Sequence, residues 1–405
     1  MDPEDRKKLQ SLGVYFGKKD LIDFKTKNLK PSKTLSGIKK SNSLGEVFFT
    51  QHEFSSNYKH GVVPFEIFFG RQSEFSTPDS DYLFNLNRCI FLDTETTGLS
   101  TSGGTFAFMV GVGWFEDHQF ILRQYFLVHP DQEEAMLLDL ENLFSFHENI
   151  VTYNGISFDI PILKFRYKYH RIPTTIAQKK QIDLLKYARM LFRYQFEDRS
   201  LKSIESKVLN FQRAEEEIAG YLAPVIYQDF LKTGETQYMD GIFYHNKMDV
   251  VSLAALISIV NEVSDGNEHH FSRYDTLHFS LARQFDKNRN YSKAIDYYLK
   301  ALEQPKLPNS IRVISLLSLA NLYKKSDLID KAMDLWRAAA DLDSVEAFIE
   351  MAKILEHRHK SYFLAFDCCK KALLILDNEV NSNKRMLLKE MIEYRMERLK
   401  NKGKI

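Results

Sequence analysis

Apolar and polar residues follow two patterns along this chain, and the first pattern predicts an α/β domain. Four mostly apolar runs of strand length cover residues 89–92, 108–115, 120–126 and 150–153. Between the third and the fourth run, residues 133–147 carry apolar side chains at helical spacing. Short apolar runs that alternate with amphipathic helices are typical of an α/β fold with a mixed sheet flanked by helices.

The second pattern covers about residues 270 to 405, which are expected to be helical throughout. Three helices are predicted to begin at Tyr291, Leu328 and Tyr362, about 35 residues apart. Small residues at this interval are typical of tetratricopeptide-like repeats, in which paired helices approach closely. The recurring alanines are Ala282, Ala294, Ala301, Ala320, Ala332, Ala339, Ala352, Ala365 and Ala372.

Three regions follow from these patterns. Residues 1–84 start with a Lys- and Ser-rich segment and predict a partly disordered N-terminal extension, 85–263 predict the α/β domain, and 270–405 predict the helical repeats. The last helix is expected to cap the repeats, because its apolar side chains occupy one stripe and its opposite face is charged. The stripe consists of Leu388, Met391, Ile392, Arg395 and Leu399.

Composition and charge restrict the classes of protein without choosing one. The net charge is +1, and the Lys/Arg excess in the first forty residues and after Lys384 fits a solvated surface as well as phosphate contacts. Three cysteines, Cys89, Cys368 and Cys369, form no even framework and predict a reducing compartment. No segment reads as a signal peptide or as about 18 consecutive apolar residues, so we expect a cytoplasmic protein without membrane spans.

The apolar run 89–92 ends on Asp93-Thr94-Glu95, the most informative segment of the chain. Side chains alternate along a strand, so Asp93 and Glu95 are expected to project from one face, about 7 Å apart. Two carboxylates at the C-terminal end of a buried strand are costly unless a cation holds them. That end is where open α/β sheets bind ligands. Because no thiolate or imidazole cluster accompanies the pair, the expected cation is a hard divalent metal.

Two further segments carry acidic side chains that could complete this site. Asp159 follows the strand 150–153 near a helix N-terminus, where it is either a helix cap or a carboxylate facing Asp93. His245 and Asp249 are four residues apart and share one helix face. Either side chain alone could have an ordinary surface role. Together they offer a base and a metal ligand one turn apart, as two-metal phosphodiester hydrolysis requires.

In their order and spacing these segments resemble the DEDD 3′–5′ exonucleases, the DnaQ-like branch of the RNase H-like fold. The matching pattern is Asp93-x-Glu95, Asn154-x-x-x-Phe158-Asp159 and His245-x-x-x-Asp249. The chain is more similar still to the YprB-type ribonuclease H-like proteins, which often carry a tetratricopeptide tail. The segments that carry this resemblance, between about residues 58 and 260, are His60-Gly61-Val62-Val63-Pro64, Gly98 to Thr105 with Phe108, Gln181-Ile182-Asp183-Leu184-Leu185, Ser200-Leu201-Lys202-Ser203-Ile204-Glu205 and His245-Asn246-x-x-Asp249.

The resemblance implies two Mg²⁺ or Mn²⁺ ions ligated by Asp93, Glu95, Asp159 and Asp249, with His245 as the catalytic base. One departure leaves the base open. In the best-known His-type exonucleases the His lies five residues before the last Asp, whereas the Tyr-type enzymes use a spacing of four. Here His245 has the spacing of four and Tyr244 the spacing of five. We favour His245, because it shares a helix face with Asp249.

Other polar residues receive weaker assignments. Asp183, at the start of a helix, is expected to cap that helix rather than to bind metal. The candidates for substrate contact are Thr96, Asn154, Phe158 and Tyr244.

The leading hypothesis is therefore a metal-dependent nuclease, acting as a 3′–5′ exonuclease on a single-stranded end of DNA or RNA. One alternative is a catalytically silent nucleic-acid-binding or scaffold protein whose repeats recruit a protein partner. Another is a structure-selective endonuclease on the same fold. Metal-induced stabilisation separates the scaffold from the enzymes, and the products of cleavage separate the two enzymes.

Overall fold

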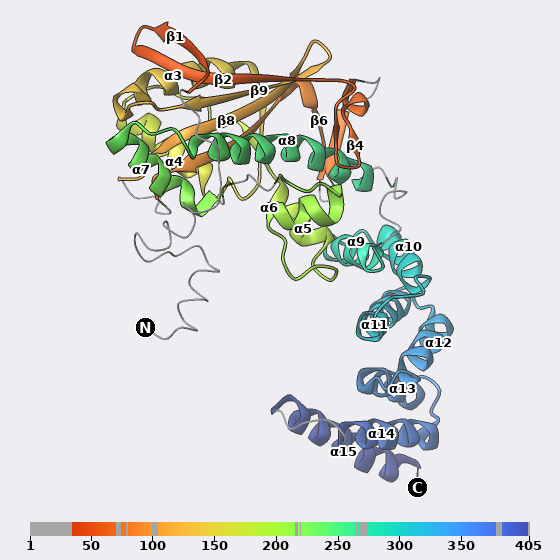
Figure 1. Cartoon of the computed structure of the whole chain (residues 1–405). Coiled ribbons are helices and arrows are strands. Elements are labelled where there is room, and N and C mark those ends of the chain that lie inside the picture. Colours follow the sequence, from red (N-terminus) through yellow and green to blue (C-terminus); the bar gives the residue numbers. More distant parts are fainter. Residues whose placement is uncertain are drawn as a thin grey trace. The chain divides into compact units, whose positions relative to one another are not determined.

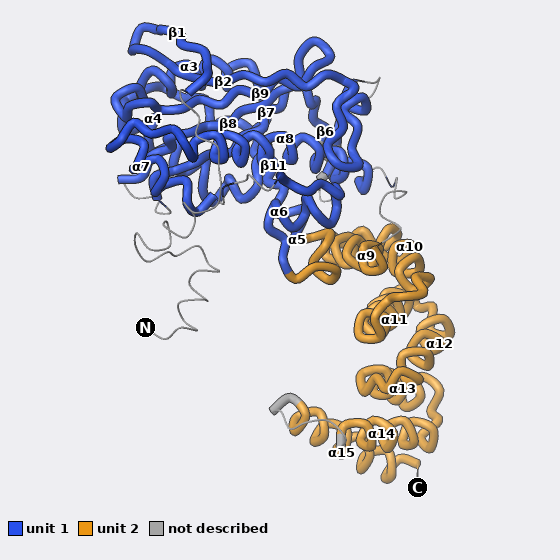
Figure 2. The backbone as a smooth tube through the Cα atoms, viewed as in Figure 1, with its two compact units in different colours: residues 1–189, 198–267 blue, residues 190–197, 268–405 orange. Residues whose placement is uncertain are grey.

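The computed structural model describes residues 35–69, 74–77, 80–98, 104–214, 218, 220–264, 266, 274–377 and 383–403. The chain divides into two compact units, residues 1–189 with 198–267 and residues 190–197 with 268–405, which Figure 2 shows in different colours. Part of the predicted disordered extension, residues 1–34, lies outside the described residues, and so do residues 99–103 of the Gly98 to Thr105 segment.

The described part of the first unit is built on a seven-stranded mixed sheet with the order β1-β2-β9-β8-β7-β10-β11 (Figure 1). Neighbouring strands from β1 to β7 in this order are antiparallel, whereas β7, β10 and β11 are parallel to one another. The predicted mixed sheet is thereby confirmed. Its strands are β1 (Ile38–Asn42), β2 (Gly45–Ser55), β7 (Cys89–Thr96), β8 (Ala107–Glu116), β9 (Gln119–Phe126), β10 (Asn149–Thr152) and β11 (Lys180–Asp183).

Helices and short hairpins complete this unit. The helices are α3 (Glu133–Phe146), α4 (Asp159–Tyr169), α5 (Leu184–Leu191), α6 (Leu201–Ile204), α7 (Ala223–Thr233) and α8 (Met239–Ser264), with a π-helical turn η4 (Glu205–Leu209). The hairpin strands are β3 (Lys59–His60), β4 (Val63–Pro64), β5 (Glu74–Thr77) and β6 (Ser80–Asn85). Single 3₁₀ turns are η1 (Phe65–Phe69), η2 (Leu86–Arg88), η3 (Pro130–Gln132) and η5 (Gly220–Leu222).

The four predicted strands are confirmed as β7, β8, β9 and β10, and the helix predicted over 133–147 is confirmed as α3. β7 continues past its apolar run to Thr96, because the polar residues that follow stay paired with β8. Asp93 lies opposite Gly111 in this pairing, and Glu95 lies opposite Met109. The acidic residues therefore belong to the strand itself and not to a loop after it.

Strands β1 and β2 differ from the sequence-based expectation, because residues 38–55 join the sheet instead of preceding it. β2 pairs with β9 along eight residues, and its Phe48 and Phe49 are buried in the core of the unit. β1 is one of the two edge strands of this sheet and is exposed over most of its length, with Lys39 and Lys40 on it. Lysines commonly protect the edges of sheets from unwanted pairing with other chains. A Lys-rich edge strand therefore cannot be told from a solvated tail by its composition.

Helices α3 and α8 cover opposite faces of the sheet. Successive side chains of a strand point to opposite faces, and on β9 the Tyr125 hydroxyl donates to Asp139 of α3 at 2.8 Å. The adjacent Gln124 donates to Asn246 of α8 at 2.9 Å. Helix α8 packs on β7, β8 and β9 (Figure 1). Its N-terminal half is thus held beside the polar end of β7.

The second unit forms helix pairs over residues 274–377 and one more helix over 383–403. The helices are α9 (Leu277–Lys287), α10 (Tyr291–Leu302), α11 (Asn309–Lys325), α12 (Ile329–Ala340), α13 (Val345–His357), α14 (Tyr362–Asp377) and α15 (Asn383–Gly403). The predicted starts at Tyr291, Leu328 and Tyr362 are confirmed to within one residue. All nine recurring alanines are fully buried, which lets the paired helices approach closely. No helix within the described ranges is both long and apolar enough to cross a membrane.

Helix α15 packs along one stripe, as predicted, with one exception. Ile392 and Leu399 are buried against α13 and α14, and Arg395 donates to the buried Glu356 of α13 at 2.6 Å. Met391 is instead 55% exposed. A helix turns about 100° per residue, so Met391 cannot share the packed direction of its neighbour Ile392.

Candidate active site

Strand β7 supplies the centre of the candidate site. It is hydrogen-bonded to β8 on one side and to β10 on the other, and its apolar residues are buried. Glu95 is buried as well and Asp93 is half-buried. The irregularity in the pairing with β8 comes after Glu95, so Asp93 and Glu95 keep the alternation of a regular strand. They project from one face, as the sequence predicted.

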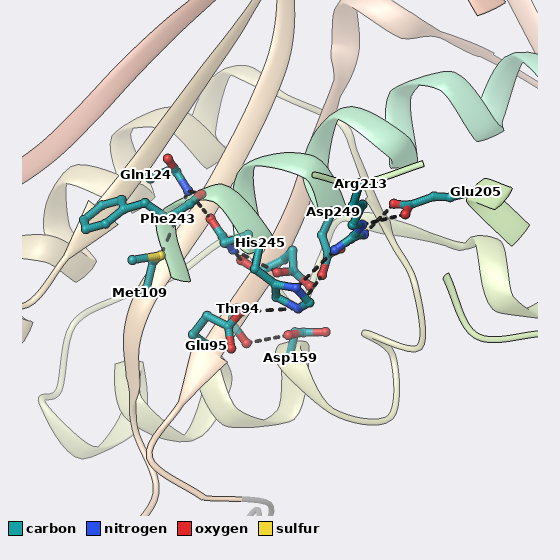
Figure 3. Close-up of polar contacts among 12 residues, drawn as sticks. Thr94, Glu95, Met109, Gln124, Asp159, Glu205, Arg213, Phe243, His245 and Asp249 are labelled. Atoms are coloured by element: carbon teal, nitrogen blue, oxygen red, sulfur yellow. Dashed lines mark hydrogen bonds and ion pairs between the residues drawn. The ribbon is translucent and has the colours of Figure 1, made fainter. Parts of the chain in front are cut away.

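Asp159, the first residue of α4, brings a third carboxylate to this place. Its Oδ1 accepts a hydrogen bond from the Thr94 hydroxyl, which ties the start of α4 to β7 (Figure 3). Phe158, not Asp159, occupies the N-cap position of α4. The sequence left open whether Asp159 caps the helix or faces Asp93. Its geometry favours the second role, because its carboxylate is turned toward β7.

Asp183 at the end of β11 has the capping role that the sequence predicted. Its Oδ1 accepts from the backbone N–H of Leu185 in α5 at 3.0 Å and from that of Asn154 at 2.8 Å. The second bond holds the loop between β10 and α4. Asp183 thus supports the approach of Asp159 from the adjacent strand end.

Helix α8 contributes Asp249 and His245, which lie one turn apart. His245 Nε2 is 3.4 Å from Asp249 Oδ2 and 3.8 Å from Glu95 Oε1 (Figure 3). The Tyr244 hydroxyl instead accepts from the backbone N–H of Ala214 at 3.0 Å. Of the two side chains that the sequence left in competition, His245 is the one that stands beside the carboxylates.

Asn246 is a site residue that sequence reasoning did not assign. It is fully buried, and its Nδ2 donates to Asp93 Oδ2 at 2.8 Å. Its Oδ1 accepts from Gln124 Nε2 at 2.9 Å, and Gln124 also donates to the backbone carbonyl of Phe243 at 2.8 Å. The only signal in the sequence was that Asn246 follows His245 in the segment His245-Asn246-x-x-Asp249, which carries part of the resemblance. This chain of hydrogen bonds fixes the orientation of Asp93.

Gly111 leaves the room that Asn246 needs. A Cβ atom at Gly111 would lie 2.2 Å from Asn246 Oδ1. We expect Gly111→Ala to displace Asn246 from Asp93, to destabilise the protein by about 2 kcal/mol and to weaken Mn²⁺ binding at least about tenfold. Thermal melts and calorimetric Mn²⁺ titrations measure both effects. Gly104→Ala is the control, because a Cβ there meets nothing within 4 Å; unchanged Mn²⁺ affinity in Gly111→Ala would contradict the role of Asn246.

Arg213 is the second site residue that the sequence did not reveal. Its guanidinium donates to Asp249 Oδ1 through Nη2 and lies 3.1 Å from His245 Nδ1 through Nη1 (Figure 3). Its Nε and Nη2 also chelate Glu205, with 2.6 Å from Nε to Oε2. A cavity of about 370 Å³ adjoins this pair. Glu205 ended one of the segments used for the resemblance, whereas nothing in the sequence marked Arg213.

Burial is the main cause of a raised pKa at three carboxylates of the site, Asp93, Glu95 and Asp159. For Asp93, repulsion by Asp249, Asp159 and Glu95 adds to burial and raises its pKa well above the usual value. Burial raises the pKa of Glu95 to about 8, although His245 and Arg213 oppose this, and raises that of Asp159 to about 6. The fold therefore gathers more negative charge than its own cations offset.

This donor set fits a hard divalent cation. All four carboxylates offer oxygen, which Mg²⁺ and Mn²⁺ prefer, and a cation would relieve their repulsion. Among the described residues, no group of three or more His, Cys, Asp or Glu side chains is arranged so that it could hold a metal ion as it stands. The fit therefore rests on donor chemistry and charge. Asp93, Glu95, Asp159 and Asp249 are the residues that would hold the metal.

The raised pKa values make metal binding depend on pH. Below about pH 8 Glu95 gains a proton, and so does Asp159 below about pH 6. Since Mn²⁺ must displace these protons, we expect its affinity to rise from pH 6 to 8 by up to about tenfold per pH unit for each proton displaced. Calorimetric titrations across this range measure the effect. Glu95→Gln should weaken binding and flatten its slope, and an affinity in the unchanged chain that is constant from pH 6 to 8 would contradict the expectation.

The four candidates for substrate contact lie around this cluster in different environments. Thr96 is buried, and its hydroxyl donates to the Gly98 carbonyl at 2.8 Å. Asn154 is exposed with a left-handed φ of 66°, and Phe158 is half-buried at the start of α4. The Tyr244 hydroxyl is engaged by Ala214. Asn154 is thus the one exposed residue of the four, and Phe158 and Tyr244 are both half-buried.

The sheet order and the acidic residues on its inner strand β7 fit the fold of the RNase H superfamily. A family model described as "RNase_H superfamily" matches residues 90–261. Over 334 residues the chain is also 30% identical to "Uncharacterized protein YprB" of Bacillus subtilis (strain 168), covering 79% of either chain. The chain belongs to the same family as this Bacillus protein, and its residues 90–261 form an RNase H superfamily domain. Nucleases of the superfamily hydrolyse nucleic acids and generally use divalent metal ions.

Proposed function

We propose that this protein is a metal-dependent nuclease that removes nucleotides from the 3′ end of a nucleic acid, with two Mg²⁺ or Mn²⁺ ions. The observation that carries the proposal is the convergence of four acidic residues from β7, α4 and α8, whose charges act on one another. These four are Asp93, Glu95, Asp159 and Asp249. Their order along the chain matches the DEDD exonucleases, which is the support for the 3′–5′ direction.

Each part of the chain has a distinct task in this proposal. The metal ions, when bound, lower the pKa of a water and offset charge on the leaving oxygen. Asp93 and Glu95 hold their positions through the rigid strand β7, and Asn246 fixes the direction of Asp93 Oδ2. His245 contacts the attacking water from the side of α8. Asn154 and Phe158 contact the terminal nucleotide of a single-stranded end.

The second unit has a separate task in the proposal. Its helix pairs, with buried alanines where the helices meet, support tetratricopeptide-like repeats. Repeats of this kind commonly bind peptides or proteins. We assign this unit the recruitment of a protein partner in the cytoplasm.

Metal-induced stabilisation distinguishes a metal-dependent nuclease from a catalytically silent scaffold. A ligand that binds only the folded state stabilises it by about 2.7 kcal/mol at one hundred times its Kd. We therefore expect MnCl₂ or MgCl₂ to raise the melting temperature of the full chain and EDTA to reverse the change. No rise at millimolar metal would contradict the proposal and favour the silent scaffold. Release of internal fragments from end-labelled substrate would instead favour the endonuclease.

A further inference from the structure

Arg213 and Glu205 form a buried ion pair at the edge of the candidate site. The side chain of Arg213 is 3% exposed and that of Glu205 is 1% exposed. Removing two charges from water costs several kcal/mol per ion, which the attraction between them offsets only in part. Such a pair is weak evidence for stability, and its best-attested use is to fix a specific geometry. The contacts of Arg213 show which geometry it fixes.

Within the part of the chain that the structure describes, the guanidinium of Arg213 contacts Glu205, Asp249 and His245. Nε and one hydrogen of Nη2 point to Glu205, Nη2 also donates to Asp249 Oδ1, and Nη1 donates to His245 Nδ1 at 3.1 Å. A guanidinium has five N–H donors in a rigid plane and no acceptor. Glu205 offsets its charge, so the guanidinium adds little repulsion toward a metal ion nearby. Asp249 keeps its other oxygen, Oδ2, on the side of His245.

The segment that carries Arg213 is itself held in place. The Phe211 N–H donates to the Glu205 carbonyl at 3.0 Å, and the Phe211 ring lies 4.0 Å from the ring of His60. His60 is fully buried and contacts Ser252 of α8 at 2.7 Å through Nε2. On the other side, Ala214 donates to the Tyr244 hydroxyl. Arg213 therefore reaches α8 from a backbone anchored on both sides.

We propose that Arg213, held by Glu205, is a positioning residue that orients Asp249 for metal binding and sets the tautomer of His245. The inference rests on the proposed function, because it assigns Asp249 to the metal. Hydrogen-bonding partners of metal ligands fix ligand orientation, and their loss costs about 10- to 100-fold in metal affinity. Because Arg213 donates to Nδ1, a neutral His245 carries its proton on Nε2, the nitrogen facing Glu95 and Asp249. His245 then offers an N–H to the site, whereas a base acting through Nε2 requires the opposite tautomer.

Calorimetric titration of the full chain with MnCl₂ tests the inference. Arg213→Gln is expected to bind Mn²⁺ about 10- to 100-fold more weakly than the unchanged chain. The matched control is Arg166→Gln in α4. Arg166 also chelates a buried glutamate, Glu133, with 2.6 Å from Nε to Oε1. Within the described residues its other polar and ring contacts are to His170, Phe106 and Tyr169, none of which is a candidate metal ligand. Its loss should lower the melting temperature and leave the Mn²⁺ affinity within about twofold.

A second variant covers the case in which Arg213→Gln does not fold. Arg213→Lys keeps the charge but lacks the planar fork that bridges Glu205 and Asp249, so it is also expected to bind Mn²⁺ more weakly. Mn²⁺ affinity equal to that of the unchanged chain in either folded variant would overturn the inference. If Asp93→Ala nevertheless abolished Mn²⁺ binding, the proposed metal site would stand and only the role of Arg213 would be wrong. No Mn²⁺ binding by the unchanged chain would contradict both.

Discussion

Asp93→Ala is expected to reduce metal-dependent hydrolysis at least about 1,000-fold. Metal ions supply several kcal/mol of transition-state stabilisation, and each 1.36 kcal/mol corresponds to a factor of ten. Asp93 lies on the inner strand β7, and Asn246 orients its Oδ2, so its loss should remove a positioned metal ligand. The same variant should lose the rise in melting temperature that Mn²⁺ causes. Single-turnover rates on a labelled oligonucleotide and thermal melts measure the two effects.

Asp139→Asn is the control for a lost buried carboxylate. Asp139 is buried in α3, where it accepts from the Tyr125 hydroxyl at 2.8 Å and from Lys40 at 2.6 Å. Its replacement should lower the melting temperature of the metal-free protein but preserve both hydrolysis and the Mn²⁺-induced shift. If Asp93→Ala kept its rate and its Mn²⁺ response, Asp93 would not be a metal ligand and the proposed mechanism would be wrong.

The second large effect is expected at His245, where two substitutions should differ. His245→Ala should lower the rate about 100- to 1,000-fold, the usual loss when a donor to the developing charge is removed. His245→Gln should keep the rate within about tenfold, because a glutamine amide can donate from near the place of Nε2. Single-turnover rates at saturating Mn²⁺ measure the difference. Tyr244→Phe should lower the rate less than His245→Ala, since the Tyr244 hydroxyl is engaged by Ala214.

The comparison of the two His245 variants separates a donor from a base. Glutamine cannot accept and pass on a proton at neutral pH, so a general base would lose about 100- to 10,000-fold in either variant. Equal losses in His245→Ala and His245→Gln would therefore contradict the tautomer set by Arg213. They would favour the catalytic base that the sequence led us to expect.

The sequence was most informative where one local pattern decides the structure. The run 89–92 is apolar at every position, as a strand buried on both faces requires, and β7 forms there with Asp93 and Glu95 at its end. The recurring alanines likewise report close helix pairing, which any helical repeat needs. In both cases the signal lies within a few residues or at a fixed interval, so no knowledge of distant contacts was required.

The sequence was least informative where a role depends on distant contacts. β2 joins the sheet by pairing with β9, about seventy residues away, and β1 joins it only through β2. The Lys-rich sequence of β1 has the composition of a solvated tail. Arg213 stands in an irregular segment without periodicity, and its role follows only from the approach of Glu205, His245 and Asp249. Asn246 looks like an ordinary polar helix residue until Asp93 and Gln124 are placed beside it.

Digestion of single-stranded DNA and RNA, each labelled at the 3′ or the 5′ end, tests whether the protein is a metal-dependent 3′–5′ exonuclease. The full chain is incubated with Mn²⁺, and the controls are EDTA and Asp93→Ala. We expect metal-dependent shortening from the 3′ end of at least one polymer, absent in both controls. Cleavage that persists in EDTA or in Asp93→Ala, or no cleavage of either polymer by a chain that binds no Mn²⁺, would contradict this expectation.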